Sequence, residues 1–274
     1  MNTKSQRDAY GQTLVELGKE DQRIVVLEAD LGKSTKSILF QQEFPERYFE
    51  MGIAEQNMAS TAAGLSLTGK IAFINSFAVF TSGRAYDQIR QTISIANLNV
   101  KICGSSSGLS DFGDGSTHQA VEDMAIMRAI PNMTVLAPVD AVETRKMVKA
   151  MVKKEGPVYI RINRNDLPII TSEETEYEIG KLYQVRAGKD VALFANGVMV
   201  SKALEAAELL EQEGISLKVI NVSTVKPLDR EGVIAAVQGC QAVVTAEEHS
   251  IIGGLGSAIA EALRGETNLP IEFV

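Results

Sequence analysis

The chain has 274 residues, of which 45% are hydrophobic and 23% charged, and its formal net charge is −8. Such a composition is globular, and the length allows one large α/β domain or two of ordinary size. The negative charge argues against a nucleic-acid surface, and no apolar run reaches the length of a membrane-spanning helix. The two cysteines, Cys103 and Cys240, lie in apolar runs without metal-ligand spacing, which favours a reduced, cytoplasmic setting.

Short apolar runs alternate with helix-like segments through the first part of the chain. The runs are continuously apolar, which is typical of parallel strands that are buried on both faces. We therefore expect a doubly wound α/β domain over residues 1–170. Its expected strands are 24–27, 71–74, 100–104, 134–137 and 157–162, and its expected helices are 7–20, one from residue 55, 80–96, 121–128 and 141–154.

An acidic and then hairpin-like stretch, with the hairpin at 177–181, interrupts this alternation, and we interpret residues 171–188 as a linker. The alternation then restarts and predicts a second, smaller α/β domain over 189–274. Its last apolar run, 269–274, reads as a strand with nothing to cover it, so we expect the polypeptide to continue or a partner to cover this edge. The other expected elements are strands at 191–195, 217–221 and 242–247 and helices at 200–213, 230–237 and 257–264.

Several polar residues follow strands of the first predicted sheet. Glu55 begins a helix of small and apolar residues, where by itself it would serve to complement the helix N-terminus. Asp30 and Ser34 follow the first strand, and Asp114 and His118 lie in a long loop after the strand at 100–104. Because the carboxyl ends of parallel strands meet at one edge, we expect these side chains to converge there.

Aromatic and basic residues are expected at the same edge. Phe77 and Phe80 follow a strand and predict either core packing or a flat wall for an aromatic ring. Arg164, directly after a strand, suits a phosphate or carboxylate, although an ordinary surface arginine has the same pattern. The second histidine, His249, has no comparable neighbours and is interpreted as structural or interfacial. The sequence lacks the dinucleotide fingerprint, the P-loop and any metal-ligand spacing, so we expect no metal site on this chain.

Taken together, these residues resemble thiamine-diphosphate enzymes of the transketolase family. The resemblance covers the pyrimidine-binding and C-terminal domains, whereas the N-terminal half, which grips the diphosphate through Mg²⁺, is absent. It implies one subunit of a split transketolase, working with an N-terminal-type partner subunit in a 2+2 heterotetramer. The matching runs are Phe49 to Met58, Asn75 to Phe77, Gly83 to Gln88, Gly113 to Gln119, Ile130 to Met133 and Ile162 to Arg164.

The resemblance also implies roles by position. Glu55 matches the glutamate that hydrogen-bonds the aminopyrimidine ring, Phe77 and Phe80 would stack beside that ring, and Asp30 would lie near the thiazolium. His118, as a catalytic residue, and Asp114 would bind sugar hydroxyls, and Arg7, Ser34 and Arg164 match a substrate-phosphate cradle. Gly113 to Gly115 is a different loop from the family's metal site. Ser106 stands where many relatives carry a histidine that helps to bind the phosphorylated end.

The implied activity is two-carbon ketol transfer between a ketose and an aldose, with phosphorylated sugars as the expected substrates. Ser106 leaves that phosphorylation open. The alternatives within the same cofactor class are a 1-deoxy-xylulose-5-phosphate synthase-like condensation of pyruvate with an aldehyde and the beta subunit of a 2-oxoacid dehydrogenase. A regulatory or structural subunit is the non-enzyme alternative, but such a subunit has no need of Glu55, Phe77 and His118 at one edge.

Overall fold

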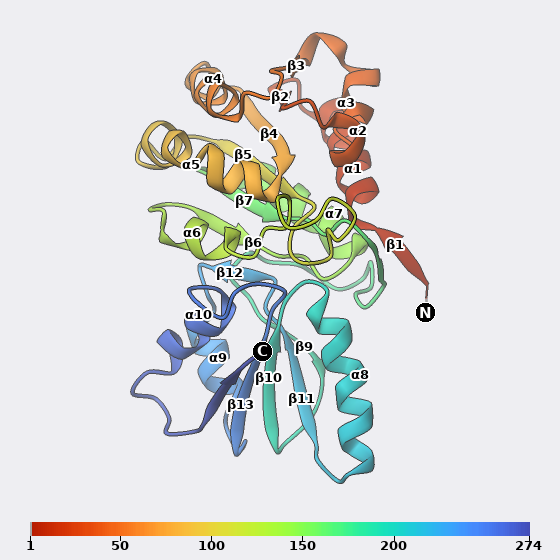
Figure 1. The fold of residues 1–274 in the computed structure, drawn as a ribbon, viewed down its shortest axis with the longest axis vertical. Helices are drawn as coiled ribbons and strands as arrows, with labels where there is room; N and C mark the ends of the chain where they lie inside the picture. The colour runs from red at the N-terminus through yellow and green to blue at the C-terminus, as the bar shows by residue number, and fades with distance from the viewer. Residues whose placement is uncertain (1) are drawn as a thin grey trace.

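Two mainly parallel sheets organise residues 2–274, the part of the chain that the computed structural model describes (Figure 1). Neighbouring strands are parallel within each sheet, except that β12 runs antiparallel to β6 and β9 antiparallel to β11. The predicted pair of doubly wound α/β domains is thus confirmed. The larger sheet has the order β12 (Thr224–Lys226), β6 (Thr134–Leu136), β7 (Val158–Arg161), β5 (Val100–Ser105), β4 (Ile71–Phe77), β2 (Ile24–Glu28) and β3 (Tyr48–Glu50).

Both faces of the larger sheet are covered, because side chains alternate along each strand. In β2, Val25 and Leu27 join one core, whereas Ile24 and Val26 join the other. The first core packs against α4 (Glu55–Leu67), the irregular helical segment after β4, and α6 (Asp123–Ala129). The second packs against α1 (Gln6–Glu20), α3 (Ile38–Glu43) and α7 (Ala141–Lys153). Short elements complete this half: β1 (Thr3–Ser5) paired with β8 (Asp166–Pro168), α2 (Gly32–Thr35) and a 3-10 turn at Pro45–Arg47.

The smaller sheet follows the same principle with fewer strands. Phe194 of its central strand packs against α9 (Arg230–Ala236) and α10 (Leu255–Leu263), and its neighbours Leu193 and Ala195 face α8 (Met199–Gln212). The order is β14 (Ile271–Phe273), β13 (Ala242–Ala246), β10 (Val191–Ala195), β11 (Leu217–Asn221) and β9 (Tyr183–Arg186).

The segment predicted as a single helix at 80–96 is not a regular helix, which corrects that expectation. It consists of a π-helical stretch at Phe80–Arg84, a short α5 at Tyr86–Gln88 and a second π-helical stretch at Ile89–Ser94. Thr81 and Ser82 bind backbone carbonyls of the preceding turn, with the Ser82 hydroxyl 2.6 Å from Ala78 O. Such side-chain bonds compete with the regular helix ladder, and π-helical stretches are frequent at functional sites.

The stretch expected as a linker contains structure that belongs to the second half. No hairpin forms at 177–181 within the described chain; instead β9, at Tyr183–Arg186, adds an antiparallel strand to the smaller sheet. The second half also contributes β12, an antiparallel edge strand of the larger sheet in which Thr224 lies opposite Leu136. The second half therefore contributes a strand to the larger sheet, and Figure 1 shows β12 lying between the two halves.

Candidate active site

Glu55 lies at the start of α4, as predicted, but its surroundings are not those of a simple helix cap. Gly52 precedes the helix with a φ of 65°, a conformation that favours glycine, and turns the chain from β3 into α4. The Glu55 side chain is only 1% exposed. Its two carboxylate oxygens accept hydrogen bonds from Arg84 Nη1 at 2.9 and 3.0 Å. Arg84 itself stays 44% exposed, so the buried carboxylate is balanced from the solvent side.

Three aromatic side chains pack beside this ion pair. The Phe77 and Phe80 rings are stacked, with centroids 6.2 Å apart and an interplanar angle of 11°. The His118 ring meets both edge-on, at 6.0 Å from Phe77 and 5.2 Å from Phe80. The Arg84 guanidinium lies 4.4 Å from the Phe80 centroid, which joins the aromatic group to Glu55. Residues from β4, α4 and the loop after β5 therefore converge at one sheet edge.

The loop after β2 brings Asp30 and Ser34 to the same edge. Asp30 is exposed and has a left-handed φ of 60°, and its amide donates to Glu50 Oε1 at 2.8 Å. Ser34 O accepts a hydrogen bond from Arg7 Nη1 at 3.0 Å, so α1 and this loop are joined through Arg7. Burial, followed by the nearby charge of Arg164, lowers the pKa of Arg7. Within residues 2–274, Arg7 Nε is buried and has no hydrogen-bond partner.

Asp114 and Arg164, which were predicted as separate contributors, contact each other directly. Arg164 Nη1 pairs with the carboxylate of Asp114 and also lies 2.7 Å from Asp111 Oδ1. Burial raises the pKa of the Asp111 carboxyl, and the Arg164 charge opposes that effect. Arg164 therefore holds the long loop at two points. Asp111 had no distinguishing pattern in the sequence, and its role follows only from this contact.

Buried hydroxyl groups lie at the carboxyl ends of β4 and β5. Ser106 has a left-handed φ of 52° and is fully buried. The hydroxyls of Ser76, Ser105 and Ser106 are buried and, within the described part of the chain, have no hydrogen-bond partner. Since buried polar groups are normally paired, these hydroxyls mark the edge as a place where a polar ligand would find partners.

A buried acid supports the loop that carries Asp30 and Ser34. Glu28 is fully buried at the end of β2 and accepts hydrogen bonds from the Thr35 hydroxyl at 2.6 Å and the Ala29 amide at 3.0 Å, and also from Ser37. Burial raises the pKa of Glu28 to about 7. The sequence showed Glu28 only as the last residue of an apolar run, so this residue was not predicted.

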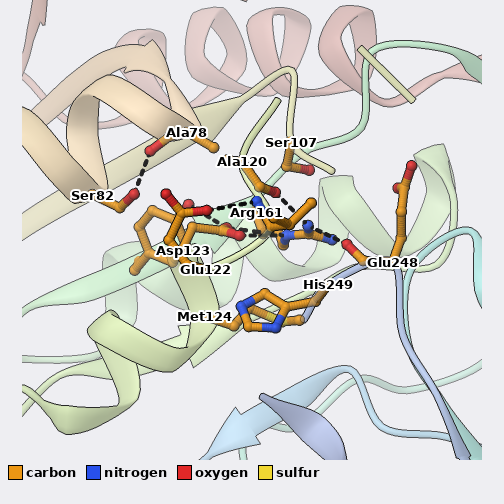
Figure 2. Close-up of polar contacts among 12 residues, drawn as sticks. Ala78, Ser82, Ser107, Ala120, Glu122, Asp123, Met124, Arg161, Glu248 and His249 are labelled. Carbon is orange, nitrogen blue, oxygen red and sulfur yellow. Dashed lines mark hydrogen bonds and ion pairs between the residues drawn. The ribbon is translucent and has the colours of Figure 1, made fainter. Parts of the chain in front are cut away.

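The second half contributes Glu248 and His249 to the neighbourhood of this edge (Figure 2). His249 has a fully buried side chain whose Nε2 accepts from the Ala125 amide at 3.3 Å, which agrees with a structural position. Arg161 pairs with Asp123 through its Nε at 3.0 Å and donates to Glu248 O at 2.6 Å. Sequence reasoning missed both Glu248 and Arg84. The spacing of Arg84 four residues after Phe80 could have indicated the contact between the Arg84 guanidinium and the Phe80 ring.

Comparison with known proteins agrees with this fold. The family model described as "Transketolase, pyrimidine binding domain" matches residues 2–169, and "Transketolase, C-terminal domain" matches residues 180–273. The chain therefore belongs to the transketolase family. Within the family it is similar to three proteins that are named as a C-terminal section, a subunit and a split-gene form of transketolase.

A protein of Methanocaldococcus jannaschii, named as a transketolase C-terminal section, is 47% identical over 95% of this chain and 82% of its own length. A 6-deoxy-6-sulfo-D-fructose transketolase subunit of Clostridium sp. is 45% identical over 98% of this chain and 83% of its own. The solved structure "Split gene transketolase, inactive beta4 tetramer" superposes with a TM-score of 0.92 at 50% identity, covering all of this chain and 89% of its own.

Membership of this family implies dependence on thiamine diphosphate. The edge fits the aminopyrimidine part of that molecule, because it offers a buried carboxylate at Glu55, the ring faces of Phe77 and Phe80, and unpaired buried hydroxyls. Among residues 2–274, no group of three or more histidine, cysteine, aspartate or glutamate side chains is arranged to hold a metal ion. Over the same residues, no helix is long and apolar enough to cross a membrane.

Proposed function

We propose that this chain supplies the pyrimidine-binding half of a thiamine-diphosphate-dependent transketolase. The complete enzyme would transfer a two-carbon ketol unit from a ketose to an aldose. The partner would be an N-terminal-type subunit that carries the diphosphate and Mg²⁺ site, in a 2+2 heterotetramer. The observation that carries this proposal is the Glu55 carboxylate, 1% exposed, joined through Arg84 to the Phe80 ring of the aromatic group.

Each residue has a defined part in this proposal. When bound, the cofactor supplies the electron sink that allows a carbon–carbon bond of the sugar to be broken. Glu55 would hold a shared proton at the pyrimidine ring nitrogen, and its burial keeps water from competing for that contact. Phe77 and Phe80 would bind the ring through their faces and exclude water from it. Asp30 would lie close to the thiazolium, at the exposed end of the β2 loop.

The sugar would lie on the side of the long loop. His118 is held edge-on to Phe77 and Phe80, and its Nδ1 is hydrogen-bonded to the Thr117 hydroxyl at 2.8 Å, which leaves its Nε2 to bind a sugar hydroxyl together with Asp114. Ser34, through its contact with Arg7, and Arg164 would form the rim that meets the far end of the substrate. The partnerless Arg7 Nε within the described chain supports an anionic group there.

The positive charge available to that anionic group is reduced, because carboxylates already pair with Arg164. Asp111 and Asp114 neutralise this guanidinium, and Ser106 adds no charge where many relatives have a histidine. A sugar phosphate therefore meets Arg7 as its main cation and is expected to bind less tightly than in a cradle with an additional histidine. The Clostridium relative is named for a sulfo sugar, which likewise carries an anionic end.

Reconstitution with a diphosphate-binding transketolase subunit from the same organism tests the proposal. The chain alone, supplied with thiamine diphosphate and Mg²⁺, should not turn over, in line with its structural relative, a split-gene transketolase described as an inactive beta4 tetramer. The reconstituted complex should transfer a ketol unit from a ketose to an aldose without releasing CO₂ from pyruvate. Turnover by the isolated chain, or CO₂ release in place of transfer, would contradict the proposal.

Glu55→Gln in the same complex tests the central residue. Loss of a positioned proton donor and acceptor typically costs about 10²–10⁴ in rate, so kcat should fall by at least about 100-fold with the fold retained. Glu46→Gln is the matched control, because Glu46 is a 69% exposed glutamate on the same half of the chain. A rate close to wild type in Glu55→Gln would remove Glu55 from the mechanism.

A further inference from the structure

The Glu248 side chain of the second domain reaches the loop that carries Asp114 and His118. Glu248 follows β13, and its carboxylate accepts hydrogen bonds from both the amide and the hydroxyl of Ser110. Its other oxygen accepts from Asn163 Nδ2 at 3.1 Å. Glu248 and Ser110 are 138 positions apart in the chain, so this contact exists only when the second domain is docked.

The loop is shaped to receive this carboxylate. Gly108 has a φ of 75°, and a Cβ at this position would overlap the Glu248 carboxyl group. Only glycine combines that backbone conformation with the space that the carboxylate occupies. Because Gly108 N also bonds to Ala120 O at 2.9 Å, the loop is closed at its base where Glu248 enters.

The position of Glu248 is itself held by its neighbours. Glu247 accepts from the amides of Leu255 and Gly256 at 2.7 and 2.9 Å and so anchors the chain to the start of α10. Arg161 donates to the backbone oxygen of Glu248 at 2.6 Å from the first domain, and Figure 2 shows it lying between Asp123 and Glu248. The Glu248 backbone is thus fixed from both domains, and its side chain is directed to the loop.

Ser110 is the residue directly before Asp111, which pairs with Arg164. Three residues outside the loop hold the stretch from Ser110 to Asp114: Glu248, Asn165 and Arg164. Asn165 Nδ2 donates to Ser110 O at 3.1 Å. Glu248 therefore holds the loop at the residue next to Asp111, at the start of the stretch that presents Asp114. The pyrimidine side of the site is separate: Glu55 begins α4, Phe77 ends β4 and Phe80 follows β4. In the described chain, none of these three residues forms a hydrogen bond with Glu248.

We infer that Glu248 is a positioning residue, by which docking of the second domain sets the sugar-binding loop over residues 108–118 without altering the pyrimidine side of the site. This inference rests on the proposed function for its enzymatic consequence, but the contact itself can be tested without it. Charge-assisted hydrogen bonds are about twice as strong as neutral ones, so the loss of this carboxylate should be measurable as loop opening.

The experiment compares Glu248→Ala with wild type by hydrogen–deuterium exchange of the purified chain. Exchange in peptides over 108–118, which include the Ser110 amide, should rise by about tenfold or more, with β4 and β10 unchanged. Glu261→Gln is the matched control, since Glu261 also pairs across the domains, with Arg128 at 2.9 Å, but does not contact the loop. Unchanged loop exchange in Glu248→Ala would overturn the inference.

Should Glu248→Ala not fold, Glu248→Gln answers the same question, because it keeps the side-chain size but removes the charge and replaces one accepting oxygen with an amide NH2. Loop exchange should then rise several-fold, and wild-type exchange would again overturn the inference. Glu248→Asp, whose shorter carboxylate keeps the charge, should restore part of the protection, and equal exchange in Asp and Ala variants would count against positioning by the carboxylate.

The reconstituted enzyme gives the second readout. In Glu248→Gln the KM for the sugar should rise by about tenfold, while exchange of the C2 proton of thiamine diphosphate stays within about twofold of wild type. A fall in the rate of C2-proton exchange as large as the fall in kcat/KM for the sugar would show general damage and overturn the positioning role. If the wild-type complex has neither activity, the proposed function fails, whereas the loop-exchange result still decides the contact between Glu248 and Ser110.

Discussion

Three carboxylates at the same sheet edge differ in what surrounds them. Glu55 is buried against the Arg84 guanidinium, Glu28 is buried among hydroxyl groups, and Asp30 is exposed. A buried carboxylate needs a cation or several hydrogen-bond donors, because desolvation penalises the charged form. Glu55 is balanced by an arginine that solvent can reach. Glu28 has only internal donors and supports the loop.

The pKa of Glu28 sets a pH dependence of stability. Its pKa is raised by burial from 4.5 in the unfolded chain to about 7 in the folded protein. The folded state therefore binds the proton more tightly, so the contribution of Glu28 is greatest below pH 4.5 and is lost as the pH rises through about 7. Glu28→Gln should remove this pH dependence, which amounts to about 3 kcal/mol of unfolding free energy between pH 4.5 and pH 7.

Urea unfolding of wild type and Glu28→Gln between pH 4.5 and 8 measures the effect. The stability of wild type relative to the variant should fall as the pH rises to about 7 and then level off. The buried acid Glu143, whose pKa burial also raises to about 7, is present in both proteins and cancels in the difference. Parallel stability curves would show that Glu28 does not titrate in this range.

Among the helices, close backbone approach decides where Arg7 and Ser34 meet. Gly11 of α1 faces the loop after α2, and a Cβ there would lie 2.5 Å from Lys36 O. Its absence allows α1 to approach this loop closely, which brings Arg7, one turn earlier, within 3.0 Å of Ser34 O. The sequence predicted α1 by its apolar spacing, but a glycine within a helix does not reveal what it contacts.

A pair of glycine substitutions tests this packing. Gly11→Ala should destabilise the protein by about 1–3 kcal/mol, because the added methyl group is forced against Lys36 O. Gly64→Ala in α4 is the control, since a Cβ at Gly64 meets nothing within 4 Å and alanine favours the helix by about 1 kcal/mol. Urea unfolding should give opposite signs for the two variants, and equal effects would mean that the Gly11 contact carries no constraint.

The irregular segment after β4 illustrates a limit of pattern reading at the level of elements. Its apolar residues Ile89 and Ile93 have the spacing of an ordinary helix, and they do face the core. The hydroxyls of Thr81 and Ser82 nevertheless donate hydrogen bonds to the backbone carbonyl of Ala78, and the segment is π-helical over Phe80–Arg84. Hydrophobic periodicity reports which face is buried and does not report the hydrogen-bond register.

In the whole molecule, the two domains are joined by more than a connecting segment. β12, from the second half, forms the edge of the larger sheet, and Lys226 Nζ donates to Arg128 O and Ile130 O of the first half. Arg161 is a buried cation that contacts both Asp123 and the backbone of Glu248. These contacts predict that neither domain unfolds independently of the other.

Differential scanning calorimetry of the intact chain checks this expectation. One transition should appear, with equal calorimetric and van't Hoff enthalpies, because β12 must leave the larger sheet when the second domain unfolds. Arg161→Met should lower the unfolding free energy by about 3–5 kcal/mol, since it leaves the buried Asp123 carboxylate without its cation. Two resolved transitions in wild type would contradict the coupling.

Local apolar patterns and motifs were enough to predict the α/β alternation, the two-sided burial of the strands and the helix that begins at Glu55. The tertiary structure alone decided the pairing of Glu55 with Arg84, the hold of Asp111 and Asp114 on Arg164, and the reach of Glu248 to Ser110. These contacts join residues 29, 53, 50 and 138 positions apart. Patterns within a few turns of chain describe burial, whereas the partner of a polar group depends on how distant elements pack.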